Sequence, residues 1–553
     1  MIARRVLPVL TLAVAVVACG EPAPGTASAR GGTIVFAVAG EPEHMAPPTI
    51  ISIQAKMVVD QVFEGLAALA PGGTTLGDAG LEPRVAESWT WSADSSTIDF
   101  KIDPQSRFHD GHPVTAADAI FSYALFQDPK VGSGFASNFP ALDSLSMVDS
   151  MTVRAHFKDR SPERIFRLAT NLTVMPKHLL EGVDRTKLSE SPFAQAPIGS
   201  GPYRFVKWDR GAGMEFRADT TRSRRRALSD RILLRFVSDL NSGARTVTAG
   251  EADFVESLRP EGLALVKADG PMRVVEYPSV DHGYLLFNMR SATDRKAPHA
   301  LFADVAVRRA IGMAIDRRAV VRIALDSLAV VSHGPFVRSS WAADTTIAQL
   351  PHDLDRARAL LDSAGWRDGN GDGIREKNGK PMRFQLSVPS VSATRKQMAV
   401  ALQEQLKQLG VDAVIDASEP ANLFPRLIQG KFDAFIHVWH EDASPSGITQ
   451  AWGGRDVEQS GNWGYYMNPK VDSLLESATL ATDRATARAL YRQAYETIVQ
   501  DAPAIFLWEP RTFALSHKRI KFDALDGVAW WTGIPQWTIP AAERLPRDGT
   551  AER

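Results

Sequence analysis

Short apolar segments bounded by glycine and proline open the folded part of the chain. Residues 34–39 (IVFAVA) form an apolar run that ends at Gly40. A run of this length beside glycine and proline is more typical of a buried strand than of a helix. Residues 87–92 (ESWTWS) and 97–102 (TIDFKI) then alternate apolar and polar positions around a four-residue turn. This alternation predicts a β-hairpin with one face in water.

Helical periodicity follows these strands and recurs further along the chain. Thr115 offers a hydroxyl at an N-cap position and Asp118 an acid three residues later, ahead of the apolar segment 120–126. Asp304 precedes apolar residues at three- and four-residue steps, and a second such segment ends at Gly410. Strands and helices intermix in runs, without a repeat of fixed period. We therefore expect α/β or α+β lobes with mixed sheets.

The first residues have the architecture of an export signal. A short cationic start precedes an apolar stretch at 6–17, which is too short to span about 30 Å of hydrocarbon comfortably. Residues 16–19 (VVAC) resemble the bacterial lipobox, which implies cleavage before Cys19 and acylation of its thiol. An ordinary signal with a chance cysteine is the alternative. We expect 1–18 to be a signal peptide and 19–32, rich in small residues and proline, to be a lipidated, flexible tether.

Composition narrows the possible classes of function. The 553 residues are 44% hydrophobic, 23% charged and 8% aromatic, ordinary values for a globular chain of about three or four domain-sized units. The 63 Lys and Arg and 64 Asp and Glu leave a net charge of −1, so nucleic acid is not expected as a partner. Cys19 is the only cysteine, which excludes an intramolecular disulfide and a cysteine-based metal site. No later segment has about 18 uninterrupted apolar residues, so the lipid is the only membrane attachment expected.

Several motifs carry a specific resemblance. LEPRVAESW at 81–89 and RFHDGHPVTAAD at 107–118 closely resemble the signature region of family-5 extracellular solute-binding proteins, the peptide- and nickel-type receptors of ABC importers. Further matches follow in family order: GSGPY at 199–203, LFN at 286–288, VRRAIGMAID at 307–316, AGW at 364–366, DGNGDGIRE at 368–376 and NPKVD at 468–472. Together they cover nearly all of the chain after its signal. The lipobox is an independent indication of an exported receptor.

The resemblance implies a two-lobed periplasmic-binding-protein fold, α/β (α+β) with mixed sheets, a hinge between the lobes and an extra domain inserted in the first lobe. It assigns 33–50, 196–278 and 501–553 to the first lobe, 51–195 to the extra domain and 279–500 to the second lobe. A ligand that contacts both lobes only when they are closed shifts the equilibrium toward the closed form, and the transporter recognises that shape.

The resemblance also implies a role. We expect a receptor and not an enzyme, a monomer without a cofactor that captures a peptide or peptide-sized solute and delivers it to the permease subunits of an ABC importer. Its expected location is the periplasmic or outer face of a bacterial cell membrane, held by the lipid on Cys19. A sensor or chaperone role and an exported hydrolase are the competing classes of function.

The candidate ligand site follows a predicted buried strand at 432–438, since α/β proteins place ligands at strand ends beside a cleft. In the peptide-binding branch of the family, a Trp-x-x-Asp motif here supplies an aromatic wall and a carboxylate that pairs with the peptide's ammonium group. Trp439 and Asp442 match that spacing. Glu441 is a weaker candidate, and Trp463 in the segment GNWGYY resembles a second aromatic wall. Solvated loop acids and core packing of the tryptophan are the alternatives.

One departure from the family pattern affects the expected ligand. Residues 443–445 are Ala-Ser-Pro, where the family usually continues with a tyrosine and a further Asp-Pro. A non-peptide solute, such as a nickel chelate or a sugar, is therefore the alternative ligand for the same fold.

Other motifs have simpler structural explanations. Residues 368–373 (DGNGDG) copy the opening of an EF-hand loop, but the twelfth position is glycine where a bidentate glutamate is required, so a turn is favoured over a calcium site. His437 and His440 lie three residues apart, but position 444 is serine where a zincin motif that begins at His440 requires a second histidine. His109 and His112 flank a turn to which the resemblance gives a structural role. We expect no metal site, and no nucleophile elbow or phosphate loop supports a hydrolase.

Overall fold

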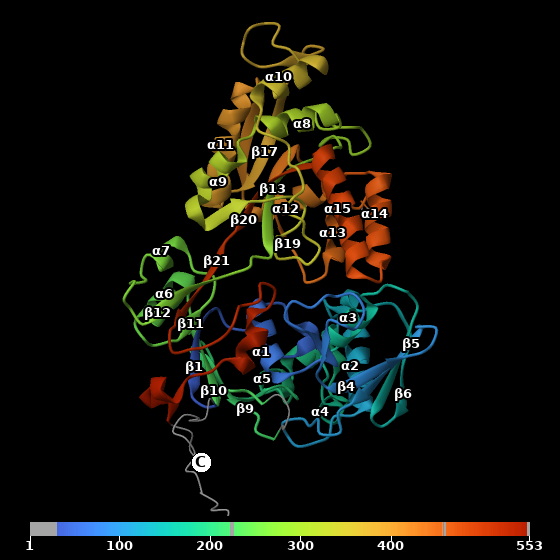
Figure 1. Cartoon of the computed structure of the whole chain (residues 1–553), viewed down its shortest axis with the longest axis vertical. Helices are drawn as coiled ribbons and strands as arrows, with labels where there is room; N and C mark the ends of the chain where they lie inside the picture. Colours follow the sequence, from blue (N-terminus) through green and yellow to red (C-terminus); the bar gives the residue numbers. More distant parts are fainter. Residues whose placement is uncertain (1–29, 222–225, 456, 458–459, 550–553) are drawn as a thin grey trace, which may run out of the picture.

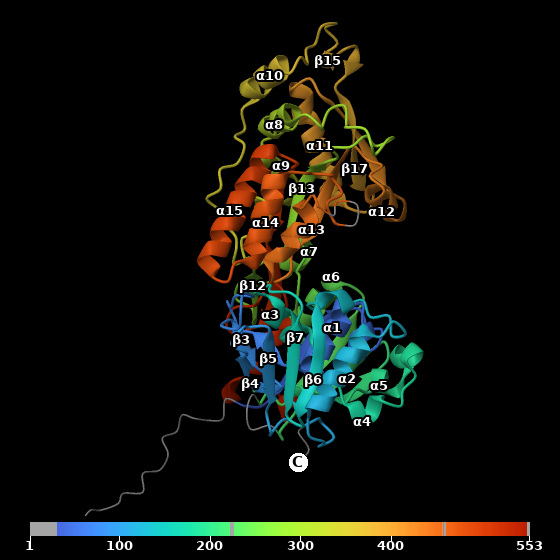
Figure 2. The same ribbon diagram turned by 90° about the vertical axis from the view of Figure 1, so that its right-hand side faces the viewer.

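The computed structural model describes residues 30–221, 226–455, 457 and 460–549, and consists of two lobes stacked along the long axis (Figures 1 and 2). The predicted signal peptide, Cys19 and most of the tether lie outside the described residues. Each lobe is built on a mixed sheet with both parallel and antiparallel neighbours. The expected two-lobed α/β fold with mixed sheets is thereby confirmed.

The first lobe contains a seven-stranded sheet. Its spatial order is β12 (Met272–Tyr277), β21 (Thr512–His517), β11 (Phe254–Val255), β1 (Thr33–Ala39), β10 (Arg231–Val237), β9 (Gly213–Ala218) and β8 (Tyr203–Asp209). Its helices are α1 (Ile53–Val62), α5 (Pro192–Gln195), α6 (Leu240–Thr248) and α7 (Pro260–Leu263).

A four-stranded antiparallel sheet stands beside it. The order is β4 (Ala86–Trp91), β5 (Thr97–Ile102), β7 (Thr152–Phe157) and β6 (Leu142–Asp149), accompanied by α2 (Ala116–Gln127), α3 (Arg164–Asn171), α4 (Lys177–Leu180) and the small pair β2 (Ala67–Leu69) and β3 (Leu81–Pro83). Buried side chains of both sheets, such as Phe36 and Phe100, belong to one continuous apolar cluster. The four-stranded unit is therefore packed onto the first lobe.

The second lobe is built on a six-stranded sheet. Its order is β14 (Ala329–Val331), β20 (Ala504–Pro510), β13 (Asp281–Phe287), β19 (Ala434–His440), β17 (Arg383–Pro389) and β18 (Asp412–Ser418). Its helices are α8 (Val305–Ala314), α9 (Arg317–Leu325), α10 (Leu354–Ser363), α11 (Ala393–Gln408), α12 (Pro420–Ile428), α13 (Ile448–Trp452), α14 (Pro469–Leu480) and α15 (Arg484–Asp501), and β15 (Glu376–Lys377) pairs with β16 (Lys380–Pro381).

Local predictions agree with these elements. β1 is buried at six of its seven positions and ends at Gly40, which has a positive φ of 102°. β4 and β5 form the predicted hairpin, and Thr115 and Asp118 form a capping box at the start of α2. The predicted turn at 368–373 is present, since the Asp368 carboxylate accepts backbone N–H groups of Gly371 and Gly373 at 2.7 and 3.0 Å.

The chain returns to the first lobe later than expected. β20 pairs with β13 and β14, so it belongs to the second sheet, and only β21 joins the first. The predicted boundary at 501 is wrong by the length of this strand, because an apolar strand after a helix has no sequence feature that assigns it to one of two sheets. Arg511 alone separates β20 from β21, and its guanidinium donates to both carboxylate oxygens of Glu276 in β12, at 2.7 and 2.5 Å.

Within the described part of the chain, no helix is long and apolar enough to cross a bilayer.

Candidate functional site

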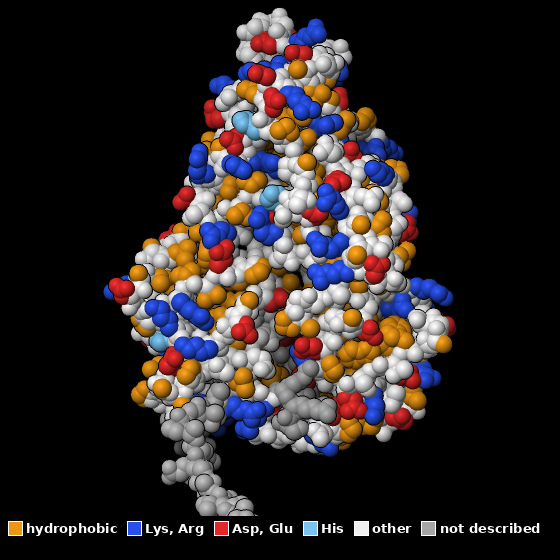
Figure 3. Space-filling model, viewed as in Figure 1, with side chains coloured by type: hydrophobic (Ala, Val, Ile, Leu, Met, Phe, Trp, Pro, Cys, Tyr) orange, Lys and Arg blue, Asp and Glu red, His pale blue; other side chains and the backbone are white. Residues whose placement is uncertain are grey.

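The ends of β1 and β19 point toward the region where the two lobes meet. In Figure 1, β19 runs toward the lower side of the second lobe, above the first lobe that contains β1. The last residues of these strands are Ala39 in β1 and His440 in β19. The space-filling view has a hollow between the lobes at this level (Figure 3). Because ligands of open α/β sheets bind beyond strand ends, the residues after these two strands are the candidates for a site.

Two tryptophans lie together at the end of β19. The rings of Trp439 and Trp463 lie 6.3 and 4.9 Å from the ring of His437, measured between centroids. The Trp439 ring also lies against the backbone of Gly461, where a side chain would come within 2.8 Å of it. Both indoles remain partly exposed. The structure thus brings together the two aromatic residues that the sequence singles out, 24 positions apart.

Asp442 has an available carboxylate. Its side chain is exposed and forms no hydrogen bond or ion pair with any described residue. The nearby His440 is engaged differently, since its Nδ1 lies 2.8 Å from Asp281, and this hydrogen bond raises the pKa of His440. An exposed acid three residues after Trp439, without a hydrogen bond or ion pair among the described residues, is suited to a cationic group of a ligand.

Glu441 has a different setting from the one expected of a ligand contact. Its side chain is only 5% exposed, its carboxylate accepts the backbone N–H of Val337 at 2.6 Å, and His282 Nδ1 lies 3.2 Å away. Burial raises the pKa of Glu441. These contacts tie the end of β19 to the start of β13 and to the loop around Val337. Glu441 is therefore buried and positions the loop that carries Asp442.

Arg395 is a charged residue near this site that the sequence reasoning missed. It lies in the first turn of α11, directly after β17, and β17 runs parallel to β19. Its guanidinium forms no hydrogen bond or ion pair with the described residues, and burial lowers its pKa. Burial, the charge of Arg395 and His282 together lower the pKa of His437 to about 3. His437 is therefore neutral at physiological pH, and the positive charge of Arg395 has no partner acid among the residues that the structure describes.

The first lobe presents apolar side chains near the end of β1. Ile51 and Ile53, at the start of α1, are 90% and 51% exposed. The Gln54 side-chain amide donates to the carbonyl of Ala39 at 2.8 Å, which holds the start of this helix beside the strand end. Large exposed aliphatic residues next to a polar strand end provide the apolar part of a mixed binding surface.

The lobes also touch away from their connecting strands. Leu76, from the loop between β2 and β3, is 5% exposed and belongs to an apolar cluster of the second lobe that includes Phe336 and Tyr491. The two lobes are therefore in contact through Leu76 as well as through the segments that connect them.

Comparison with known families shows to which family the protein belongs. The pattern described as bacterial extracellular solute-binding proteins, family 5 (middle region), matches residues 80–459. The chain belongs to this family. As a family-5 solute-binding protein it is a member of a class of receptors that work with ABC transporters.

Similar proteins support the assignment over most of the chain. The oligopeptide-binding protein AppA of Bacillus subtilis is 27% identical over 447 residues, which cover 78% of this chain and 80% of AppA. The structure of AppA with a nonapeptide has a TM-score of 0.70 at 24% identity and covers 92% of this chain and 99% of the other. NikZ of Campylobacter jejuni, solved with Ni(L-His), has a TM-score of 0.71 at 26% identity, with coverages of 92% and 99%. Related family-5 proteins thus bind chemically different solutes.

Proposed function

We propose that this family-5 protein is a peptide receptor, in which Asp442 binds the ammonium group of the ligand and Trp439 and Trp463 contact its side chains. The observation that carries the proposal is the Asp442 carboxylate, which follows the strand that carries Trp439 and has no hydrogen bond or ion pair with a described residue. Trp463 and the Arg395 guanidinium both lie close to His437 of the same strand. A peptide is a molecule with one ammonium, one carboxylate and apolar side chains between them, so it matches all of these groups.

The energetics favour such a ligand in a closed cleft. When the lobes exclude water, a charged hydrogen bond between Asp442 and an ammonium group becomes stronger, because the effective dielectric constant falls. Without a ligand the same carboxylate is better left exposed, since burying an unpaired charge costs several kcal/mol. Asp442 therefore favours closure only when a cation accompanies it. The relatives named above as oligopeptide-binding support this class of ligand.

We propose that the rest of the organisation follows the same family plan. Residues 1–18 are removed, Cys19 is acylated, and 19–32 tether a monomeric receptor to the outer side of the cytoplasmic membrane or to a further membrane. Residues 51–195 form the extra domain of the first lobe, and the second lobe extends from 279 to the end of β20. Release from the membrane fraction on Cys19→Ala substitution tests the anchor.

The deciding experiment is native mass spectrometry of the chain without its first 19 residues, followed by denaturing release of what co-purifies. The expected result is a set of peptide masses on the wild-type protein that are lost on Asp442→Asn substitution. Asp355→Asn is the matched control, because its carboxylate is 93% exposed on α10 of the same lobe. A protein that ignores a peptide library but is thermally stabilised by nickel–histidine or a sugar would overturn peptide binding and keep the receptor fold.

A further inference from the structure

A cluster of two histidines and one aspartate lies on the four-stranded unit, at the end of the molecule remote from the second lobe. Asp110 and His112 belong to the turn between β5 and α2, and His178 belongs to α4, which lies at the lower end of the molecule in Figure 1. One potential ligand atom of each residue lies within 4.8 Å of the others. The cluster is separate from the site between the lobes.

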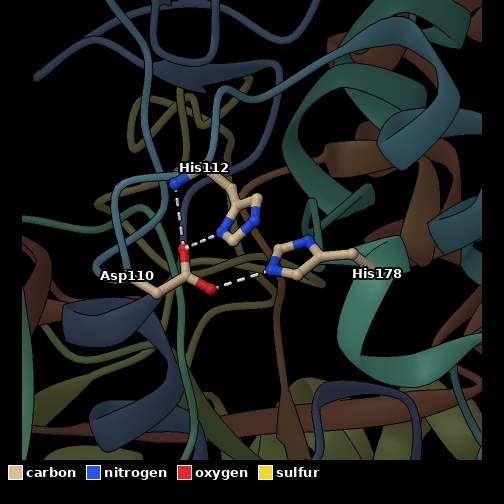
Figure 4. Close-up of side chains that lie close together, drawn as sticks. All are labelled: Asp110, His112 and His178. Atoms are coloured by element: carbon tan, nitrogen blue, oxygen red, sulfur yellow. Dashed lines mark hydrogen bonds and ion pairs between the residues drawn. The ribbon is translucent and has the colours of Figure 1, made fainter.

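The side chains converge on one carboxylate (Figure 4). His178 Nε2 lies 2.8 Å from one oxygen of Asp110, and His112 Nδ1 lies 3.3 Å from the other. The two imidazole rings stack with centroids 4.1 Å apart and an interplanar angle of 28°. Each ring therefore presents a nitrogen to a different oxygen of the same carboxylate.

The turn holds its two residues in place from behind. Gly111 has a positive φ of 91°, and Phe108 donates its N–H to the carbonyl of His112 at 2.9 Å. His109 points the other way, because its Nε2 lies 3.0 Å from the carbonyl of Gly201. With His109 anchored inward, Asp110 and His112 are left on the outer side of the turn.

The position of His178 is fixed through a shared carboxylate. Asp118, which forms the capping box of α2, also accepts the backbone N–H of Lys177 at 2.9 Å. The start of α4 is thus tied to the start of α2, which itself follows the turn that carries Asp110. His178 stands opposite that turn because of this link, 66 positions further along the chain than His112.

We propose that Asp110, His112 and His178 form a binding site for a divalent transition-metal ion of the zinc or nickel class, with water completing the coordination. Imidazole nitrogens and a carboxylate oxygen bind zinc at about 2.0–2.2 Å, which places neighbouring ligand atoms of a tetrahedral ion about 3.4 Å apart. The nitrogens of His178 and His112 lie 2.8 and 3.3 Å from the oxygens of Asp110, and the three potential ligand atoms all lie within 4.8 Å of one another. Small rotations of the side chains are therefore sufficient to reach the separation that a tetrahedral ion requires. This donor set suits such ions better than calcium or magnesium, which prefer oxygen.

Electrostatics and access agree with a metal ion. The two stacked rings and the carboxylate gather three lone-pair donors at one place, with 4.1 Å between the ring centroids. One dication provides both rings and the carboxylate with an opposite charge or a coordination bond at once. The three side chains are 24%, 60% and 30% exposed, so an ion can reach them from solvent. Bound there, it would link the turn to α4.

The test is isothermal titration calorimetry, in which Zn²⁺ or Ni²⁺ is added to untagged protein without its first 19 residues. We expect one equivalent of bound ion, and a loss of affinity of at least about tenfold on His178→Ala or His112→Gln substitution. His156→Ala is the control, because His156 forms a similar pair with Asp143 at 3.1 Å but has no second histidine in that pair. Asp110→Asn preserves the shape of the carboxylate and serves if a histidine variant is unstable.

The same titrations separate this site from the one between the lobes. Histidine NMR spectra should shift at His112 and His178 on addition of Zn²⁺, and peptide binding should be unaffected by His178→Ala. Absence of binding, or binding that the Asp110, His112 and His178 variants leave unchanged, would overturn the proposal and make the cluster an ion pair only. Metal binding lost instead on Asp442→Asn would assign the ion to the cleft and would also overturn it.

Discussion

The hydroxyl oxygen of Ser444 in the second lobe lies 2.7 and 2.6 Å from the two carboxylate oxygens of Glu163, at the start of α3 in the four-stranded unit. Glu163 is only 3% exposed and also accepts a hydrogen bond from Thr75. Beside it, Leu76 inserts into the second lobe. A polar and an apolar contact therefore join the lobes at one place, and Ser444 belongs to the segment in which this chain departs from the family pattern.

Ser444→Ala should favour a more open arrangement of the lobes. Glu163 would lose one of its two hydroxyl partners in a buried position, which costs about 1–3 kcal/mol. The expected result is a larger radius of gyration in small-angle scattering without ligand and a peptide affinity weaker by up to about tenfold. Ser363→Ala, on the exposed side of α10, is the control. Identical scattering and affinity for both variants would show that the contact does not influence closure.

Asp442→Asn and Glu441→Gln should separate binding from stability. We expect Asp442→Asn to weaken peptide binding several-fold or more with little change in Tm, because its carboxylate has no partner among the described residues. Glu441→Gln should lower the free energy of unfolding by about 1–3 kcal/mol, because the buried contacts with Val337 and His282 are disturbed. Thermal denaturation and calorimetric titration of both variants measure this. Equal effects of the two substitutions on Tm would contradict the assignment of roles.

Arg395→Gln should change the preference for the charge of the ligand's carboxyl end. The wild-type protein is expected to bind a peptide with a free carboxylate more tightly than the same peptide with a C-terminal amide, and the variant should bind both alike. Paired calorimetric titrations with the two peptides test this. Lys396→Gln, the exposed neighbour in the same helix, is the control. If the wild-type protein does not distinguish the two peptides, Arg395 has no such role.

His437 should make the protein less stable in mild acid. Its pKa is about 3 in the folded protein and 6.5 as a free group, so the unfolded chain binds more protons between these values. Its contribution to stability is complete above pH 6.5 and decreases as the pH falls toward 3, by about 2 kcal/mol between pH 6.5 and pH 5.

His437→Gln should therefore flatten the dependence of Tm on pH between 6.5 and 5, because the neutral amide does not titrate. His352→Gln, an exposed histidine of the second lobe, should leave the dependence unchanged. A variant that loses stability in acid as steeply as the wild-type protein would show that another group is responsible.

Local features of the sequence predict local structure well here. The β4–β5 hairpin, the capping box at Thr115 and the strand before Gly40 each depend on a few consecutive residues. The resemblance supplies the segments in which Trp439 and Trp463 lie, and in the structure both rings lie near His437.

What the sequence could not give depends on which strands and helices lie side by side. Arg395 approaches His437 only because β17 and β19 are parallel neighbours, and His178 meets Asp110 only because Asp118 links two helix starts. Glu441 and Asp442 are adjacent in sequence yet have opposite environments, since one is held by Val337 and the other is exposed. Burial of a single loop residue is set by distant contacts, which no local pattern contains.

The chain crosses between the lobes at residues 278–280, which connect β12 to β13, and again at Arg511, and these two crossings restrict how the lobes can move. The two connections are short and are joined by the contact between Arg511 and Glu276. They therefore define a hinge axis about which one lobe rotates relative to the other. Rotation about any other axis would stretch one crossing while it compressed the other. If the protein is the receptor proposed above, the angle of this single rotation distinguishes a receptor that holds a solute from an empty one.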